Sequence, residues 1–447
     1  MRRHLRRSRR KFLSPRAWKV RLVFWTGAIL IGLVCALLAR LAEHANAAFL
    51  ALAQAYPLAP LVVTPVAMTL IAWLTLRWFP GSQGSGIPQA IAALRIPGKA
   101  AILSLRIAIG KFILVLLGLL GGGSIGREGP SVHIGASIMF SLGRLVRFPP
   151  HYMERGLILA GGAAGVAAAF NTPLAGIMFA IEEMSRSFEN RTSGIVTVAV
   201  VLAGVTALAI LGPYHYFGVV EPAPAPTLDV WLAVLVCGIG GGLAGGLFGA
   251  LLVTGSQRLA PFARRFPLRL AFFFGLALAC IAWLSDYSAS GTGYAEAKAI
   301  LAGTAEYDPW YSPAKFLATL ASYLTGIPGG IFAPSLATGA GVGADLGHWL
   351  PVAPLSVMIL LGMLGYFCGV VQSPLTAFVI VMEMTAERNM LLPLLATSFL
   401  AYGASHLVNP RPLYHTLAMA FVDKSPQSRT SGSDAESKPR AHDKSRS

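Results

Sequence analysis

The feature that most constrains this chain is the scarcity of charge along its central 400 residues. Residues 22–421 carry only 20 basic and 15 acidic side chains, whereas a soluble protein is about one-quarter charged. Uncharged stretches recur throughout, and the first of them, 22–39, is 18 residues long. That length is enough for one helix to cross a hydrocarbon core of about 30 Å. The body of the chain is therefore a membrane domain.

The net charge of +17 comes mainly from the two ends of the chain. Residues 1–21 hold ten basic side chains and no acid, and residues 422–447 hold six basic side chains and four acids. This distribution excludes a nucleic-acid-binding protein organised around a basic face, despite a pI near 10.1. The first tail is too basic, and the apolar run after it too long, for a cleaved secretory signal. We expect 1–20 to be a cytoplasmic tail and 422–447 a disordered cytoplasmic tail.

Glycine and proline are frequent in this body, with 48 and 29 residues in the chain. They predict broken and tilted helices rather than full-length hairpins. A Pro-rich external link over 213–228 divides the membrane region into repeat 1 (21–212) and repeat 2 (229–421). Because Lys and Arg favour the cytoplasmic side, segments 186–191 and 258–269 are expected inside the cell, and the link, which lacks both residue types, outside.

Two motifs recur in the two halves in the same order. The matched pairs are GREGPS at 126–131 with GIFAPS at 330–335, and NTPL at 171–174 plus Glu182 with QSPL at 372–375 plus Glu383. Because the N-terminus is expected inside and the link outside, each half crosses the membrane an odd number of times, so the halves are inverted relative to each other. Inverted repeats with short broken helices indicate a transporter or channel whose site lies between the halves.

Three short loops share one design, in which glycines are followed by a proline: GSGIP at 84–88, GREGP at 126–130 and GGIFAP at 329–334. Gly permits unusual backbone angles and Pro favours the first turn of a helix, so each loop is expected to open a helix. The unpaired first N–H groups and the positive end of the helix dipole suit an anion. A glycine-rich packing contact is the alternative for any single loop. Three such loops in one chain favour the anion site.

These loops, together with AAAFNTPLAGIMFAIEEM at 167–184 and Tyr414, resemble the CLC chloride channel and transporter family, in family order over about residues 20–421. The resemblance implies an all-α polytopic membrane protein, a homodimer with one anion pathway per subunit. It implies chloride and protons as the transported partners and a bacterial inner membrane location with cytoplasmic termini. No cofactor, metal or nucleic acid is expected, and the short C-terminal tail predicts no paired nucleotide-binding (CBS) domains.

The resemblance also implies a central chloride site. The hydroxyls of Ser85 and Tyr414 and the backbone N–H groups of Ile331 and Phe332 would hold the anion there. Within the family, Ser at position 85 accompanies a preference for chloride. Gln89 stands where a Glu is common, and we expect this difference to affect packing rather than coordination.

An outer chloride site is implied at the backbone N–H groups of Arg127, Glu128 and Gly129. Glu128 would be the gate, because a carboxylate among N–H donors can occupy an anion position and protonation releases it. Glu183 would exchange protons with the cytoplasm. From the residues alone, ion pairs of Glu128 with Arg127 and of Glu183 with Arg186 are the alternatives.

We therefore expect chloride/proton antiport with a glutamate that competes with the anion. A passive chloride channel, gated by voltage or pH, is the alternative on the same scaffold. An intramembrane enzyme is the alternative from another class, since acids in membranes also perform acid–base chemistry. The sequence contains no Walker A loop and no HExxH motif, and its four cysteines have no CxxC spacing, so we expect neither an enzyme nor a metal site.

Overall fold

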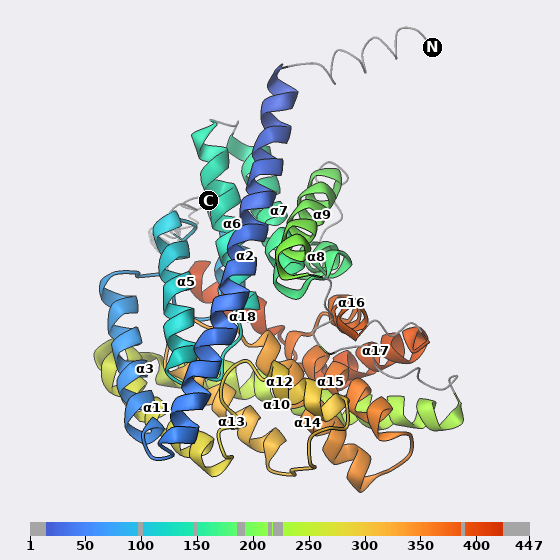
Figure 1. Cartoon of the computed structure of the whole chain (residues 1–447). Coiled ribbons are helices and arrows are strands. Elements are labelled where there is room, and N and C mark those ends of the chain that lie inside the picture. The colour runs from blue at the N-terminus through green and yellow to red at the C-terminus, as the bar shows by residue number, and fades with distance from the viewer. Residues whose placement is uncertain are drawn as a thin grey trace, which may run out of the picture.

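The computed structural model describes residues 15–96, 102–146, 150–185, 193–212, 217, 227–385 and 389–422. Every regular element among these residues is a helix, as Figure 1 shows. The predictions about segment 186–191, about the tails before residue 15 and after residue 422, and about almost all of the external link concern residues outside this set.

The helices fall into two groups on either side of the link. In the first half they are α2 (Pro15–Ala55), α3 (Pro60–Arg77), α4 (Ile87–Ala93), α5 (Leu105–Leu120), α6 (Glu128–Leu145), α7 (Pro150–Phe170), α8 (Pro173–Phe179), the π-helical turn η2 (Ala180–Ser185) and α9 (Ser193–Leu211). In the second half they are α10 (Leu228–Arg265), α11 (Pro267–Leu284), α12 (Tyr294–Leu301), α13 (Tyr311–Leu324), α14 (Phe332–Trp349), α15 (Leu355–Val371), α16 (Pro374–Thr385), α17 (Leu391–Val408) and α18 (Leu413–Val422).

The first helix is longer than the uncharged run that predicts it. Helix α2 continues through Arg40 and Glu43 and ends only at Ala55. Arg40 donates to the carbonyl oxygen of Ile210 in α9, and Glu43 lies 3.4 Å from a guanidinium nitrogen of Arg127. Because both charges have partners, the helix need not end at them. At 1.5 Å per residue its 41 residues span about 60 Å, so α2 runs obliquely along the whole molecule (Figure 1).

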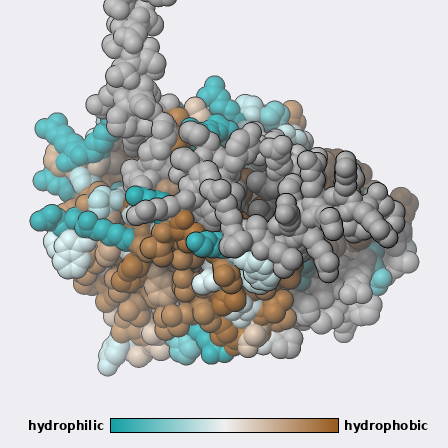
Figure 2. Space-filling view, turned by 90° about the horizontal axis from the view of Figure 1, so that it is seen from above, coloured by the Kyte–Doolittle hydropathy of each residue, from teal (hydrophilic) through white to brown (hydrophobic). Residues whose placement is uncertain are grey.

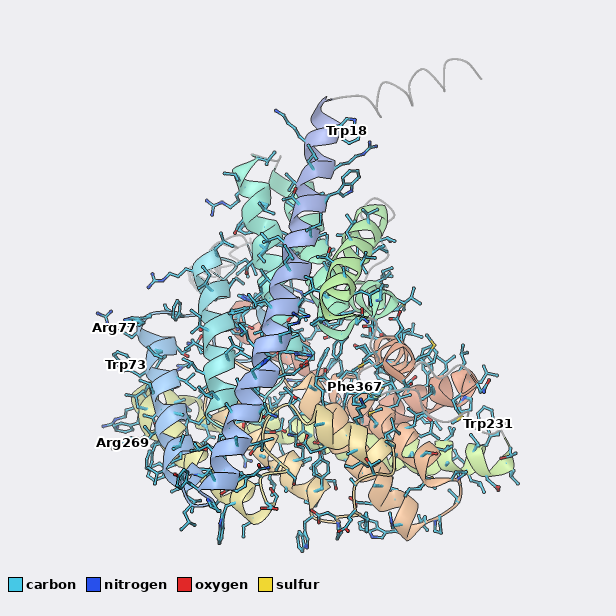
Figure 3. The ribbon with its side chains drawn as sticks, viewed as in Figure 1. Trp18, Trp73, Arg77, Trp231, Arg269 and Phe367 are labelled. Carbon is cyan, nitrogen blue, oxygen red and sulfur yellow. The ribbon has the colours of Figure 1, made fainter. Side chains whose placement is uncertain are left out.

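The outside of the helical body is apolar. Among the described residues, α2, α3, α10, α11 and α17 are long and apolar enough to cross a membrane. Seen from above in Figure 2, the coloured surface carries a broad hydrophobic area. Trp73 and Trp231, both partly exposed, lie at opposite sides of the molecule (Figure 3), as expected for aromatic side chains that meet the membrane interface. The protein is thus embedded in a membrane by many apolar helices.

The predicted repeat is present in the backbone. Asn171 and Gln372 occupy matched positions, and both adopt a left-handed conformation with φ of 57°. Each breaks an apolar run that the sequence shows as continuous. Pro173 and Pro374 then open the short helices α8 and α16, which pack against each other.

Carboxylates of η2, which follows α8 directly, and of α16 cap the starts of α16 and α8 in turn. Glu182, at the end of the first half, accepts hydrogen bonds from two N–H groups in the first turn of α16, at 3.1 and 2.7 Å. Glu383 accepts from two N–H groups in the first turn of α8, at 3.2 and 2.9 Å. The carboxylates satisfy backbone donors that a helix start leaves unpaired. This reciprocal exchange relates the two halves and gives Glu182 a structural role.

Candidate functional site

The three glycine-rich loops meet at the centre of the molecule. Gly126 and Gly330 exchange two backbone hydrogen bonds of 2.7 Å each. The N–H of Gly84 donates to the carbonyl of Ile327 at 3.1 Å, and its carbonyl accepts from the N–H of Gly329 at 3.3 Å. Helices α4, α6 and α14 begin two or three residues after these glycines, as predicted. Their N-terminal ends, drawn from both halves, therefore face one region.

The residues predicted for a central anion site lie together in that region. Ser85 precedes α4, Ile331 and Phe332 open α14, and Tyr414 lies in the first turn of α18 with its hydroxyl facing Ser85. All four are buried. The two hydroxyl oxygens are inaccessible to solvent and have no hydrogen-bond partner among the described residues. Two buried hydroxyl donors thus supplement the N–H groups of α14, which have no intrahelical acceptor.

Aromatic rings enclose this region. The ring of Phe332 meets the ring of Tyr414 edge-on at 5.7 Å and that of Phe367 at 5.1 Å. Phe170 stacks on the other side at 5.9 Å. Figure 3 shows Phe367 in the interior of the helical body. Such apolar walls exclude water, which strengthens the attraction between an anion and the surrounding N–H and O–H dipoles.

Glu128 is the first residue of α6, and its side chain is fully buried. The carboxylate lies near the backbone N–H group of Ala333 in α14, and a methyl group added to Gly126 would collide with its Oε2 atom. The hydroxyl of Tyr294 donates to Oε1 at 3.0 Å. The carboxylate therefore occupies the space in front of the starts of α6 and α14, where the helix ends favour negative charge.

The side chain of Arg127 is directed mainly toward α2. Its Nη1 atom donates to the carbonyl of Ala39 at 2.5 Å and pairs with Glu43 at 3.4 Å, whereas its Nε atom lies 3.8 Å from Glu128. The alternative considered from the sequence, an Arg127–Glu128 ion pair, is present as the 3.8 Å contact between Arg127 Nε and Glu128 Oε1.

Gly129 is pressed against the Ser85 loop. A Cβ atom at Gly129 would overlap Ser85 Oγ and would lie 3.0 Å from the Ser85 carbonyl oxygen. Only glycine lets the first turn of α6 approach the loop this closely. The residues predicted for the outer chloride site therefore lie directly beside those predicted for the central site.

Sequence reasoning missed a lysine behind the same loop. Lys111 of α5 is fully buried, and its Nζ atom donates to the carbonyl of Gly84 at 2.9 Å. The one signal for it was a single Lys inside the apolar run that forms α5. The buried amide of Gln89 donates to the carbonyl of Gln83 at 2.6 Å.

Glu183 lies on the opposite side of the central region, in the π-helical turn η2, and is fully buried. Single π-helical turns are frequent at functional sites. Ser373 donates to its Oε2 atom. His415 Nε2 lies 3.2 Å from the Glu183 carbonyl oxygen, and His415 Nδ1 lies 3.3 Å from a guanidinium nitrogen of the exposed Arg95. Arg186, the predicted alternative partner of Glu183, is outside the described residues.

A pocket of about 360 Å³ opens beside the start of α12. Arg127 and Tyr294 form its inner wall, and Glu43, Asn46 and Lys298 contribute polar groups. Tyr294 thus lines this pocket and also contacts the buried carboxylate of Glu128.

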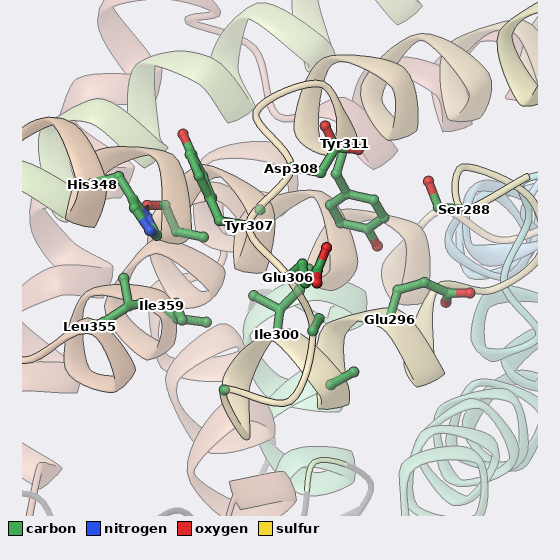
Figure 4. Close-up of a pocket in the computed structure, with 15 residues that line it drawn as sticks. Ser288, Glu296, Ile300, Glu306, Tyr307, Asp308, Tyr311, His348, Leu355 and Ile359 are labelled. Atoms are coloured by element: carbon green, nitrogen blue, oxygen red, sulfur yellow. Dashed lines mark hydrogen bonds between the residues drawn. The ribbon is translucent and has the colours of Figure 1, made fainter. Parts of the chain in front are cut away.

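A second pocket, of about 390 Å³, contains none of the predicted site residues. It lies between α12, α14 and α15 and is lined by the acidic residues Glu296, Glu306 and Asp308 (Figure 4). At its edge Tyr307 donates to Asp345 at 3.1 Å. Burial and the Asp345 carboxylate raise the pKa of Tyr307, so this hydroxyl stays protonated. Among the described residues, no cluster of His, Cys, Asp and Glu side chains could hold a metal ion.

Comparison with known sequences gives a consistent result. The family model described as "Voltage gated chloride channel" matches residues 67–406. The H(+)/Cl(−) exchange transporter ClcA of Yersinia pestis bv. Antiqua (strain Angola) is 32% identical over 408 residues, which cover 87% of this chain and 83% of that protein. The protein of the same name from Vibrio cholerae serotype O1 (strain M66-2) is 31% identical over 359 residues, or 77% of this chain and 76% of that protein.

Solved structures share the fold over nearly the whole chain. A slow cyanobacterial Cl−/H+ antiporter matches with a TM-score of 0.79 and 25% identity, covering 92% of this chain and 99% of that chain. A CLC-type fluoride/proton antiporter matches with a TM-score of 0.77 and 24% identity, covering 90% and 99%.

Proposed function

Because the chain belongs to the voltage-gated chloride channel family, we propose that it exchanges chloride for protons across a bacterial inner membrane. The curated relatives that are named H(+)/Cl(−) exchange transporters match it over most of their length, which supports this activity. The observation that carries the proposal is the buried carboxylate of Glu128, which stands at the converging N-terminal ends of α6 and α14.

Glu128 acts as the gate of the anion pathway. Its deprotonated carboxylate fills an anion position formed by N–H groups of Arg127, Glu128 and Gly129. Protonation removes the negative charge, so the side chain loses its attraction to the helix ends and leaves the position to chloride. One residue thereby links the movement of a proton to that of an anion.

Chloride binds next in the central position. Ser85 and Tyr414 donate their hydroxyl hydrogens, and the N–H groups of Ile331 and Phe332 complete the shell. These dipoles replace water without a fixed positive charge at the anion, which keeps binding weak enough for release.

Protons reach Glu128 from the cytoplasmic side by way of Glu183. Its carboxylate is buried, and Tyr414 lies within electrostatic range of both Glu183 and Glu128. The His415 and Arg95 contacts lie between Glu183 and an exposed surface. A buried acid on this route favours antiport over passive chloride conduction, because a channel needs no second proton carrier.

All residues of the proposed pathway come from one chain, which supports one complete pathway in each subunit of a homodimer. The basic N-terminal tail supports a cytoplasmic N-terminus, and the C-terminus lies on the same side in this proposal. Chloride and protons, the second subunit and the lipid bilayer are the partners, and no nucleic acid is involved.

The test is simultaneous measurement of chloride and proton flux in liposomes that contain the purified protein. An imposed chloride gradient is expected to drive proton movement. The Glu128→Ala variant is expected to keep chloride flux and lose proton coupling, because the competing carboxylate is absent. Glu306→Ala, which removes an exposed carboxylate from the second pocket, is the control and is expected to transport normally. Intact proton coupling in Glu128→Ala would refute the gate, and chloride flux without proton movement in the unmodified protein would indicate a channel.

A further inference from the structure

We propose that Tyr294 is a positioning residue that holds the Glu128 carboxylate in the anion position. This inference rests on the proposed role of Glu128 as the gate. Tyr294 is the first residue of α12 in the second half of the chain, and Glu128 is the first residue of α6 in the first half. The two side chains are joined by a hydrogen bond from the tyrosine hydroxyl to Oε1, at 3.0 Å.

The surroundings hold the tyrosine ring in place. Gly293, immediately before it, has a φ of 81° and caps α12. The Nζ atom of buried Lys315 donates to three consecutive carbonyls of the preceding loop, at 2.9 to 3.0 Å. On the ring itself, the guanidinium of Arg127 lies 5.8 Å from the centroid, and the ring of Phe217 packs at 5.8 Å. The hydroxyl is therefore presented by a rigid helix start rather than by a free loop.

Tyr294 lies between the 360 Å³ pocket and the Glu128 carboxylate. Its side chain is half-buried and lines the 360 Å³ pocket, while its hydroxyl contacts a fully buried carboxylate. Arg127 lines the same pocket, but its guanidinium is engaged with Ala39 and Glu43.

A neutral hydrogen-bond donor is better suited than a cation to holding the Glu128 carboxylate only while it is deprotonated. A hydrogen bond to a charged carboxylate is about twice as strong as one between neutral groups. The hydroxyl therefore holds the deprotonated carboxylate and loosens its hold once the carboxyl group is protonated. A cationic partner at 3 Å would keep the carboxylate ionised and fixed. The Arg127 Nε atom lies farther from the carboxylate than the Tyr294 hydroxyl does, at 3.8 Å.

Removal of the hydroxyl has a predictable effect on chloride binding. Because the carboxylate competes with chloride for one position, its occupancy raises the chloride concentration needed for half-maximal transport. Loss of a charge-assisted hydrogen bond reduces that occupancy by about tenfold. In Tyr294→Phe, the half-saturating external chloride concentration is therefore expected to fall by up to about tenfold, with little change in the maximal rate.

The experiment is a double-mutant cycle in liposomes, with initial chloride flux measured against external chloride concentration. The variants are Tyr294→Phe, Glu128→Ala and the two combined. Tyr307→Phe is the matched control, because the Tyr307 hydroxyl also donates to a carboxylate, that of Asp345, but at the separate pocket of Figure 4. We expect a lower half-saturating chloride concentration in Tyr294→Phe and in Glu128→Ala, and no change in Tyr307→Phe. We expect no further change when Tyr294→Phe is added to Glu128→Ala, because the carboxylate that it holds is gone.

The outcomes separate this inference from the proposed function. If Glu128→Ala loses proton coupling but Tyr294→Phe has the chloride dependence of the unmodified protein, the positioning role is wrong and the gate stands. The positioning role is also wrong if Tyr294→Phe acts equally in the presence and absence of Glu128, since that would reveal a general structural effect. If Glu128→Ala retains proton coupling, the gate itself is wrong.

Discussion

The reciprocal caps between the two halves allow a quantitative comparison within one molecule. Glu182 accepts three hydrogen bonds, from two N–H groups and from the Thr376 hydroxyl, at 2.7 to 3.1 Å. Its repeat partner Glu383 accepts two, at 2.9 and 3.2 Å. Both side chains are half-buried. The two sites therefore share one geometry and differ by one hydrogen bond.

Replacement of either glutamate by alanine should destabilise the protein in proportion to the bonds lost. At a net value of about 1 kcal/mol per hydrogen bond, the expected losses are about 3 kcal/mol for Glu182→Ala and about 2 kcal/mol for Glu383→Ala. At about 2 °C per kcal/mol, these losses lower the melting midpoint by about 6 and 4 °C. Glutamine at either position keeps one acceptor oxygen, so the decrease should be about half as large.

The assay is thermal unfolding in detergent, followed by tryptophan fluorescence at a single scan rate, since the unfolding of membrane proteins is governed partly by its rate. Glu306→Ala is the control, because this exposed carboxylate lies outside the caps, and its midpoint should not move. The reasoning from bond counts would be refuted if the melting midpoint fell further in Glu383→Ala than in Glu182→Ala. Equal melting midpoints for the glutamine and alanine variants would refute it as well.

Two further substitutions test the site. Glu183→Gln should reduce proton coupling in the liposome flux assay while chloride flux continues, because glutamine cannot carry a proton; unchanged coupling would remove Glu183 from the proton route. Gly129→Ala should weaken chloride binding by about tenfold in titration calorimetry, because its methyl group would overlap Ser85 Oγ and force the loop away from α6. Gly403→Ala, where the added methyl group meets open space, is the matched control, and equal affinities in these two variants would contradict the argument.

Local sequence patterns account for much of the candidate site. The three Gly–Pro loops predicted the helix starts at Ile87, Glu128 and Phe332, since the conformations of Gly and Pro act on their immediate neighbours. The matched NTPL and QSPL motifs predicted a repeat, and the structure shows equivalent left-handed residues at Asn171 and Gln372.

Residues that act through distant contacts could not be found in this way. Tyr294 lies 166 positions from Glu128, in a stretch with no motif, and only packing brings its hydroxyl to the carboxylate. Lys111 stood out only as an isolated charge in an apolar run, and its partner Gly84 is 27 positions away. The continuation of α2 beyond the uncharged run, through Arg40 and Glu43, likewise depends on distant partners, which lie in α9 and at Arg127.

The amino-acid sequence was sufficient to predict that the chain lies in a membrane, that its two halves repeat, and that three loops begin helices. These properties follow from composition, periodicity and backbone preferences, which act locally. The tertiary structure alone decided that the three loops bond to one another, that Glu182 and Glu383 cap each other's half, and that Glu128 meets Tyr294. Such contacts join residues far apart in the chain, and their geometry depends on how the two halves pack.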